Sequence, residues 1–108
     1  MKTLTNVAID DFNDDAIRVY FDLDGVENFA TLSIGSHTFR IVDESFSHAF
    51  GIEKSFGYEF DAHLYLTYLE DSEGDETTLD EDVLVSLKNV VLEEMQEMCP
   101  QDMYEMFH

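Results

Sequence analysis

The sequence predicts an α+β fold in which an antiparallel sheet of about four strands packs against a short helix and a long amphipathic C-terminal helix. Alternating apolar and polar side chains in residues 58–69 and in shorter runs before them indicate strands. Apolar residues at three- and four-residue spacing in the last third of the chain indicate a helix. The length of 108 residues and the hydrophobic content of 44% suit a single domain over residues 1–108.

The first strand-like segments lie before residue 24. Residues 1–15 contain a short apolar run followed by a cluster of aspartates, which indicates a short edge segment and then a loop. Residues 16–23 alternate in the manner of a strand. We expect this strand to end in a turn at Asp24-Gly25, because that pair is typical of tight turns.

Two further strands and a short helix are expected before residue 52. Residues 29–34 and 37–42 are apolar enough for strands, and Gly35-Ser36 between them suits a two-residue hairpin turn with glycine first. Residues 43–51 then have a helical distribution of apolar side chains, with a glycine placed to end the helix.

The strand over residues 58–69 is the longest run of strand chemistry in the chain. Its even positions are expected to face the core. These positions are Tyr58, Phe60, Ala62, Leu64, Leu66 and Tyr68. The run continues into residues 70–76, which are acidic apart from one serine and one glycine. We expect this segment to be a solvated acidic loop.

The long helix is expected to begin after this loop. Thr78 and Glu81 have the spacing of a capping box, and Pro100 disfavours helical geometry at the residue before it. The sequence therefore predicts a helix from Thr78 to about Met98, packed on the sheet through one apolar stripe. The stripe consists of Val83, Leu84, Leu87, Val90, Val91, Met95 and Met98.

The charge is the most unusual property of the sequence. There are 25 acidic residues against 5 lysines and arginines, a formal net charge of -20. Phosphates and anionic lipid headgroups would meet a surface of their own sign, so direct binding to nucleic acid or to membranes is excluded. The lone Cys99 forms no internal disulfide, and neither a signal-peptide pattern nor an 18-residue apolar run is present. These features predict a cytoplasmic protein.

One local motif points to enzyme chemistry. The segment Val-Tyr-Phe-Asp-Leu-Asp-Gly-Val at residues 19–26 resembles the first motif of the haloacid dehalogenase-like phosphohydrolases. The resemblance implies Asp22 as nucleophile and Asp24 as general acid-base, and Gly74-Asp75 with Asp80 is similar to that family's late metal-binding pattern. The rest of the chain departs from the family, since two short strands follow Asp24 with no room for a crossover helix.

No cofactor or metal is predicted. The histidines are scattered along the sequence without the short spacings of a metal site. An EF-hand frame through Asp22 and Asp24 would place Tyr20 and Thr31 at positions that require carboxylates.

The remaining signal is distributed negative charge on a compact scaffold. It favours a non-enzymatic inhibitor that blocks the basic nucleic-acid-binding surface of a partner protein, acting as a monomer or weak dimer. The expected partner-binding residues are Glu59, Asp61, Glu70, Asp71, Glu73, Asp75, Glu76, Asp80, Glu81 and Asp82.

An immunity protein that neutralises a nuclease toxin is preferred, because aromatic and methionine side chains near the acids suit a tight interface. These side chains are Tyr65, Tyr68, Met103, Tyr104 and Met106. A phage-type nucleic-acid mimic, directed against restriction or CRISPR effectors, and a small phosphohydrolase are the alternatives. A generally acidic surface adapted to high salt would have the same composition.

Overall fold

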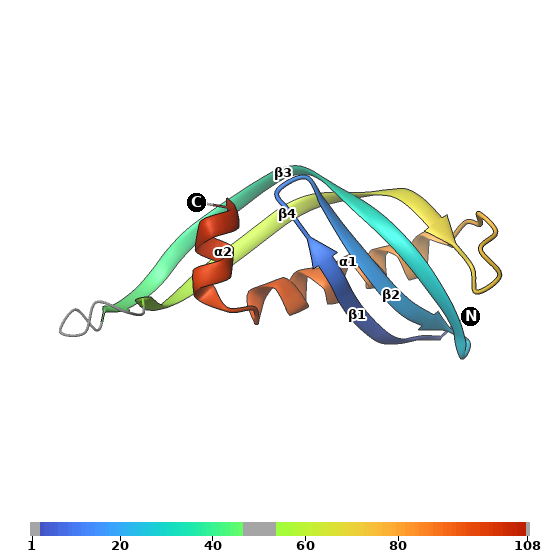
Figure 1. Ribbon diagram of the computed structural model, residues 1–108, viewed down its shortest axis with the longest axis horizontal. Coiled ribbons are helices and arrows are strands. Elements are labelled where there is room, and N and C mark those ends of the chain that lie inside the picture. The colour runs from blue at the N-terminus through green and yellow to red at the C-terminus, as the bar shows by residue number, and fades with distance from the viewer. Residues whose placement is uncertain (1–2, 47–53, 108) are drawn as a thin grey trace.

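The computed structural model describes residues 3–46 and 54–107. The elements in chain order are β1 (Leu4–Phe12), β2 (Ala16–Leu23), β3 (Val26–Phe46), β4 (Lys54–Glu70), α1 (Glu81–Gln96) and α2 (Pro100–Phe107). Neighbouring strands pair antiparallel in the order β1-β2-β3-β4 (Figure 1). The α+β class and the antiparallel four-stranded sheet are thereby confirmed.

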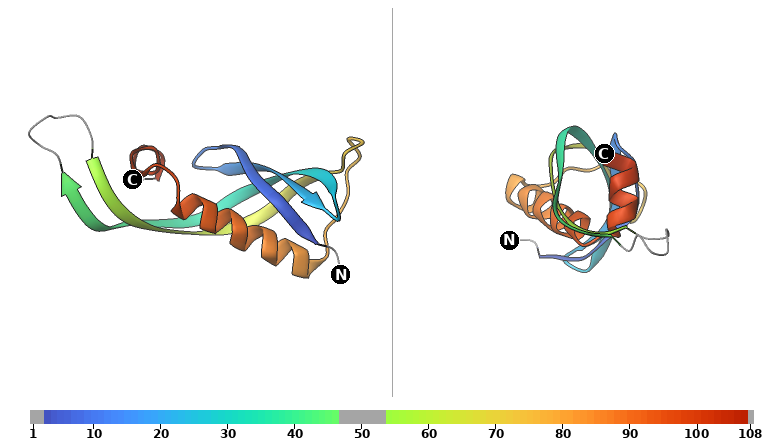
Figure 2. Two further views of the ribbon diagram at one scale, coloured as in Figure 1. Left: turned by 90° about the horizontal axis from the view of Figure 1, so that it is seen from below. Right: turned by 90° about the vertical axis from the view of Figure 1, so that its left-hand side faces the viewer.

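Both helices pack against the sheet (Figure 2). Helix α1 contacts the two edge strands, β1 and β4, and α2 contacts β3 and β4. The fully buried side chains of the core are Phe21, Ile17, Leu32, Leu69, Leu87, Met95, Met103, Val19 and Val91. The molecule that results is elongated, with extents of 52 × 24 × 22 Å.

Strand β2 and the turn after it follow the predicted pattern. Ile17, Val19 and Phe21 are fully buried, so alternate residues of β2 face the core. Asp24 and Gly25 have φ values of 52° and 81°, and the flanking residues pair directly across the turn. Two consecutive positive φ values define a type I′ hairpin, which suits the twist of the strands.

The hairpin predicted at Gly35-Ser36 is wrong, because β3 runs through this position as one strand of 21 residues. Gly35 instead forms a bulge: Ile34 pairs with Leu64 and Ser36 pairs with His63, which leaves Gly35 as an extra residue. An added Cβ at Gly35 would clash with the ring of Tyr65. Glycine here allows the ring of Tyr65 to pack closely against the backbone of a continuous strand.

The short helix predicted from residue 43 is also wrong where it can be compared. Residues 43–46 belong to β3, and the backbone ladder with β4 continues to the pair Phe46 and Lys54. The rest of the predicted helix, residues 47–51, lies outside the described residues. Pairing with a strand of similar length has outweighed the local helical pattern.

Strand β1 is longer than the short edge segment that was predicted. Its pairing with β2 is interrupted between Thr5 and Ala8 and again between Ile9 and Asp11. Asn6, inside the first irregularity, has a φ of 52°. Because of these irregularities, apolar and polar residues do not alternate strictly along β1, so its full length was not predicted from the sequence. They still allow four apolar side chains to pack against the core, namely Leu4, Val7, Ile9 and Phe12.

In β4 the predicted alternation holds only as far as Leu66. Phe60 and Leu64 are 3% and 2% exposed, as expected for the inner face. The pairing with β3 then shifts by one residue after Leu66. Beyond this bulge Leu69 is 2% exposed, whereas Tyr68 is 39% exposed and lies on the outer face. The prediction that Tyr68 faces the core is therefore wrong, because one extra residue reverses the two faces of a strand.

The helical region differs from the prediction at both ends. Helix α1 has Asp80 as N-cap residue, without a side-chain capping bond, so the capping box from Thr78 is wrong. The predicted stripe is correct at its centre, since Val83, Leu87 and Val91 are buried. The chain ends in α2, a helix of 8 residues, and not in a long C-terminal helix. Pro100 starts this second helix, because proline is well tolerated at a first helical position.

Candidate functional site

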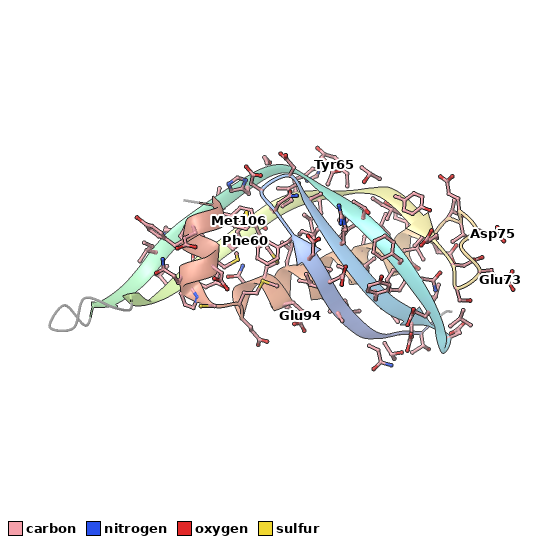
Figure 3. The ribbon with its side chains drawn as sticks, viewed as in Figure 1. Phe60, Tyr65, Glu73, Asp75, Glu94 and Met106 are labelled. Carbon is pink, nitrogen blue, oxygen red and sulfur yellow. The ribbon has the colours of Figure 1, made fainter. Side chains whose placement is uncertain are left out.

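Carboxylates gather at the end of the molecule where β4 leads into α1. We call these residues the acidic end. They are Glu70, Asp71, Glu73, Asp75, Glu76, Asp80, Glu81 and Asp82. Figure 3 shows Glu73 and Asp75 at the outer limit of this end, with Glu94 on the helix far from them. The structure thus brings together those predicted contact residues that are close in sequence.

The acidic end is built on an ordered loop. The backbone N–H groups of Glu73 and Asp75 donate to Oδ1 of Asp71 at 2.9 and 3.1 Å. Glu70 and Glu76 form a backbone bridge that closes the loop at its base. The side chain of Asp71 is thus occupied with the loop itself, while Glu73, Asp75 and Glu76 are exposed. Because the loop backbone is already held, a partner that binds these exposed carboxylates does not have to order the loop, which lowers the conformational entropy lost on binding.

The turn between β2 and β3 lies beside this loop. Asp24 in the turn and Asp71 in the loop line the same groove of about 310 Å³. Oδ1 of Asp24 also accepts a 2.8 Å hydrogen bond from the backbone N–H of Thr3. From the sequence, Asp24 was predicted only as part of an enzyme motif and not as part of the acidic surface. The turn was predictable, but its approach to a loop nearly 50 residues later depends on the sheet order.

Basic side chains do not neutralise the acidic end within the part of the chain that is described. The ion pairs among the described residues are Arg18 with Asp11, at 3.3 Å, and Arg40 with Glu59, and neither includes a residue of the acidic end. Lys88 lines a groove of about 510 Å³ together with Glu76 but forms no ion pair with it. The carboxylates therefore repel one another, and a basic partner would relieve this repulsion.

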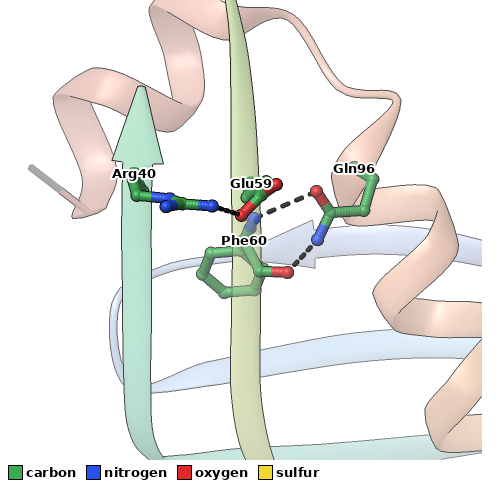
Figure 4. A network of polar contacts seen from close by, with 4 residues as sticks. All are labelled: Arg40, Glu59, Phe60 and Gln96. Carbon is green, nitrogen blue, oxygen red and sulfur yellow. Dashed lines mark hydrogen bonds and ion pairs between the residues drawn. The ribbon is translucent and has the colours of Figure 1, made fainter. Parts of the chain in front are cut away.

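Glu59 and Asp61, also predicted as partner-binding residues, do not join the acidic end. Asp61 precedes Glu70 by nine positions on β4, which corresponds to about 30 Å along an extended strand. Glu59 forms an ion pair with Arg40 of the neighbouring strand β3 (Figure 4). The predicted residues are therefore divided between two separate regions of the molecule.

Figure 4 also shows how the free edge of β4 is closed near Glu59. The backbone N–H of Phe60 donates to Oε1 of Gln96 at 3.0 Å, and Nε2 of Gln96 donates to the carbonyl oxygen of Phe60. Close by, the hydroxyl of Tyr58 donates to the carbonyl oxygens of Met95 and Met98. Burial is the main cause of the raised pKa of Tyr58. These contacts hold the C-terminal part of α1 against β4.

A second acidic surface lies between β1 and α2. It is a groove of about 470 Å³ that combines apolar and acidic side chains. The lining residues are Ile9, Asp10, Asp11, Phe12, Met98, Asp102, Glu105 and Met106. This groove was not predicted from the sequence, because its two walls come from opposite ends of the chain.

The residues of the phosphohydrolase-like motif have structural partners. Oδ2 of Asp22 accepts a 2.7 Å hydrogen bond from Nδ2 of Asn6, and Asp24 lies in the type I′ turn. All described strand pairs are antiparallel, which differs from the parallel core that the resemblance implies. In the described residues, no group of three or more His, Cys, Asp or Glu side chains is arranged to hold a metal ion.

Within residues 3–46 and 54–107, neither helix is long and apolar enough to cross a membrane. Comparisons with protein-family models, with curated proteins and with solved structures found no match to this chain.

Proposed function

We propose that the protein is a non-enzymatic acidic inhibitor that blocks the basic nucleic-acid-binding surface of another protein. It would act in the cytoplasm as a monomer or weak dimer, without a metal or cofactor. The observation that carries the proposal is the acidic end, an ordered loop whose exposed carboxylates form no ion pair in the described part of the chain. The contact face is proposed to be this end, extended by Asp24.

The physical basis is electrostatic complementarity. Proteins that bind nucleic acids hold the phosphates with lysine and arginine side chains, so their binding surfaces are strongly basic. A cluster of carboxylates fits such a surface and speeds the encounter between the two proteins. Direct binding of this chain to nucleic acid is opposed by its net charge of -20.

The neighbourhood of the acidic end favours an immunity protein over a pure nucleic-acid mimic. Tyr68 is 39% exposed and donates a 2.6 Å hydrogen bond to Glu70, so an aromatic ring lies directly beside the acids. Tyr65 is 48% exposed on the same strand. Met103, which was expected to take part, is fully buried and is not available. Aromatic side chains are typical anchors of tight protein interfaces, whereas a mimic needs mainly carboxylates.

An immunity protein is expected to be encoded next to its toxin, so the proposal predicts a nuclease gene adjacent to that of this protein, and the test uses that nuclease. Cleavage of plasmid DNA should stop at about one equivalent of inhibitor, since a specific 1:1 complex is expected. A variant of the acidic end, E73Q/D75N/E76Q, should inhibit less. A matched control that removes the same charge elsewhere, D14N/E93Q/E94Q, should inhibit like the unaltered protein.

Two outcomes decide between the alternatives. Inhibition of unrelated restriction nucleases, in addition to the nuclease of the adjacent gene, would favour the mimic, because a nucleic-acid mimic fits phosphate-binding surfaces in general. Undiminished DNA cleavage in the presence of a large molar excess of the protein would refute the proposed function.

A further inference from the structure

Three aromatic side chains form a continuous patch on the outer face of the sheet. Tyr20 on β2, Phe29 on β3 and Tyr68 on β4 make up this patch, which we call the aromatic triad. The ring centroids of Tyr20 and Phe29 are 5.0 Å apart, and those of Phe29 and Tyr68 are 6.5 Å apart. The rings are inclined by 52° and 63°, so they meet at the tilted and edge-on angles that aromatic pairs prefer.

The triad faces away from the core. Val19 and Phe21, on either side of Tyr20, are fully buried, and successive residues of a strand point to opposite faces. Tyr20 and Tyr68 remain 40% and 39% exposed. Tyr68 lines a groove with Leu84 and Lys88 of α1, so this helix borders the patch, but both tyrosines remain accessible to a partner.

Carboxylates flank the triad on the side of the acidic end. Phe29 pairs directly with Glu70 across the β3–β4 ladder, and Glu27 precedes Phe29 by two residues on the same face. The hydroxyl of Tyr68 donates a hydrogen bond to Glu70. This bond is the main cause of the raised pKa of Tyr68, and it holds the ring beside the carboxylate. Arg18, also on this face, already forms an ion pair with Asp11.

An aromatic surface bordered by carboxylates is complementary to a flat cation. A guanidinium group can stack on a tyrosine ring and donate paired hydrogen bonds to a neighbouring carboxylate. An ammonium group lacks the planar fork and is more strongly hydrated. A nucleic-acid base could also stack on the rings, but its phosphates would meet Glu27 and Glu70.

We propose that the aromatic triad, with Glu27 and Glu70, is a docking surface for arginine side chains of a basic protein segment. The proposal rests on the proposed function in one respect, since the same basic partner would then contact both the acidic end and this face. It adds a preference for arginine over lysine that charge alone does not produce.

The experiment compares two probes, a peptide of nine arginines and a peptide of nine lysines, by isothermal titration calorimetry. The unaltered protein should bind the arginine peptide about two- to fivefold more tightly, as expected for exposed cation–π contacts. In the variant Y20V/Y68T this preference should fall, because stacking on the rings is lost while paired hydrogen bonds to the carboxylates remain. The acidic-end variant E73Q/D75N/E76Q should bind both peptides more weakly but keep the preference.

Two controls make the result specific. Y65T removes an exposed tyrosine of β4 outside the triad and should keep the preference, and Y68F, which retains the ring, should keep it too. Equal affinity of the unaltered protein for both peptides, or an undiminished preference in folded Y20V/Y68T, would overturn the proposal. Because neither probe is a nuclease, a failure of the inhibition assay leaves this result unaffected, and the two proposals can fail separately.

Discussion

The contact between Gln96 and Phe60 allows a quantitative prediction about stability. Replacing Gln96 with alanine removes the partners of both the N–H and the carbonyl group of Phe60. Each such hydrogen bond contributes a net 0.5–1.5 kcal/mol, so we expect a loss of about 2 kcal/mol in the free energy of unfolding. For a domain of this size the loss corresponds to a fall of about 10 °C in Tm. Alanine has the higher helix propensity, so weakening of α1 itself cannot explain a loss.

The assay is urea unfolding followed by circular dichroism, together with hydrogen exchange of the Phe60 amide. The matched control is Q101A, which removes a 3.0 Å side-chain bond to Glu105 on the surface of α2. Such exposed pairs contribute only about 0.2–0.5 kcal/mol. The reasoning would be refuted if Q96A and Q101A lost equal stability, or if the Phe60 amide exchanged equally fast in Q96A and the unaltered protein.

Two further predictions concern Tyr58 and Asp22. Because the pKa of Tyr58 is raised, folding binds its proton more tightly, so the contribution of Tyr58 is complete below pH 10 and is lost as pH rises through its folded pKa. Urea unfolding should be measured between pH 8 and 11.5, which is about the range in which tyrosines ionise. Y58F should lose less stability over this range than the unaltered protein, and equal losses would contradict this prediction. D22N should keep the fold, because its side-chain oxygen can still accept the bond from Asn6. Magnesium-dependent hydrolysis of a phosphoester by the unaltered protein, with no hydrolysis by D22N, would contradict this structural role of Asp22.

Features that depend on short-range sequence were predicted well. Alternation in β2, the turn at Asp24-Gly25 and the buried positions Leu87 and Val91 follow from a few neighbouring residues each. The bulge at Gly35 was not predictable in this way. Glycine before serine suits a hairpin turn equally well, and only the long partner strand β4 decides for a bulge.

In the candidate site, too, features set by neighbouring residues were predictable and contacts between distant segments were not. The acidic character of residues 70–82 is visible in the sequence, because the carboxylates lie close together along the chain. The ion pair of Glu59 with Arg40 and the approach of Asp24 to Asp71 join segments that are far apart in the chain. Tyr68 was assigned to the wrong face because one bulge residue reversed the alternation.

The most direct test of the proposed function is the salt dependence of association with the nuclease that the proposal expects the adjacent gene to encode, measured by stopped-flow fluorescence. Raising the ionic strength from about 0.01 M to about 0.15 M shortens the Debye length from about 30 Å to about 8 Å. The association rate should fall steeply, and the dissociation rate should change less. The variant E73Q/D75N/E76Q should slow association more than it speeds dissociation. The control D14N/E93Q/E94Q should change neither rate. An association rate that is equal at both salt concentrations, or equal for the two variants, would contradict the acidic end as the contact face.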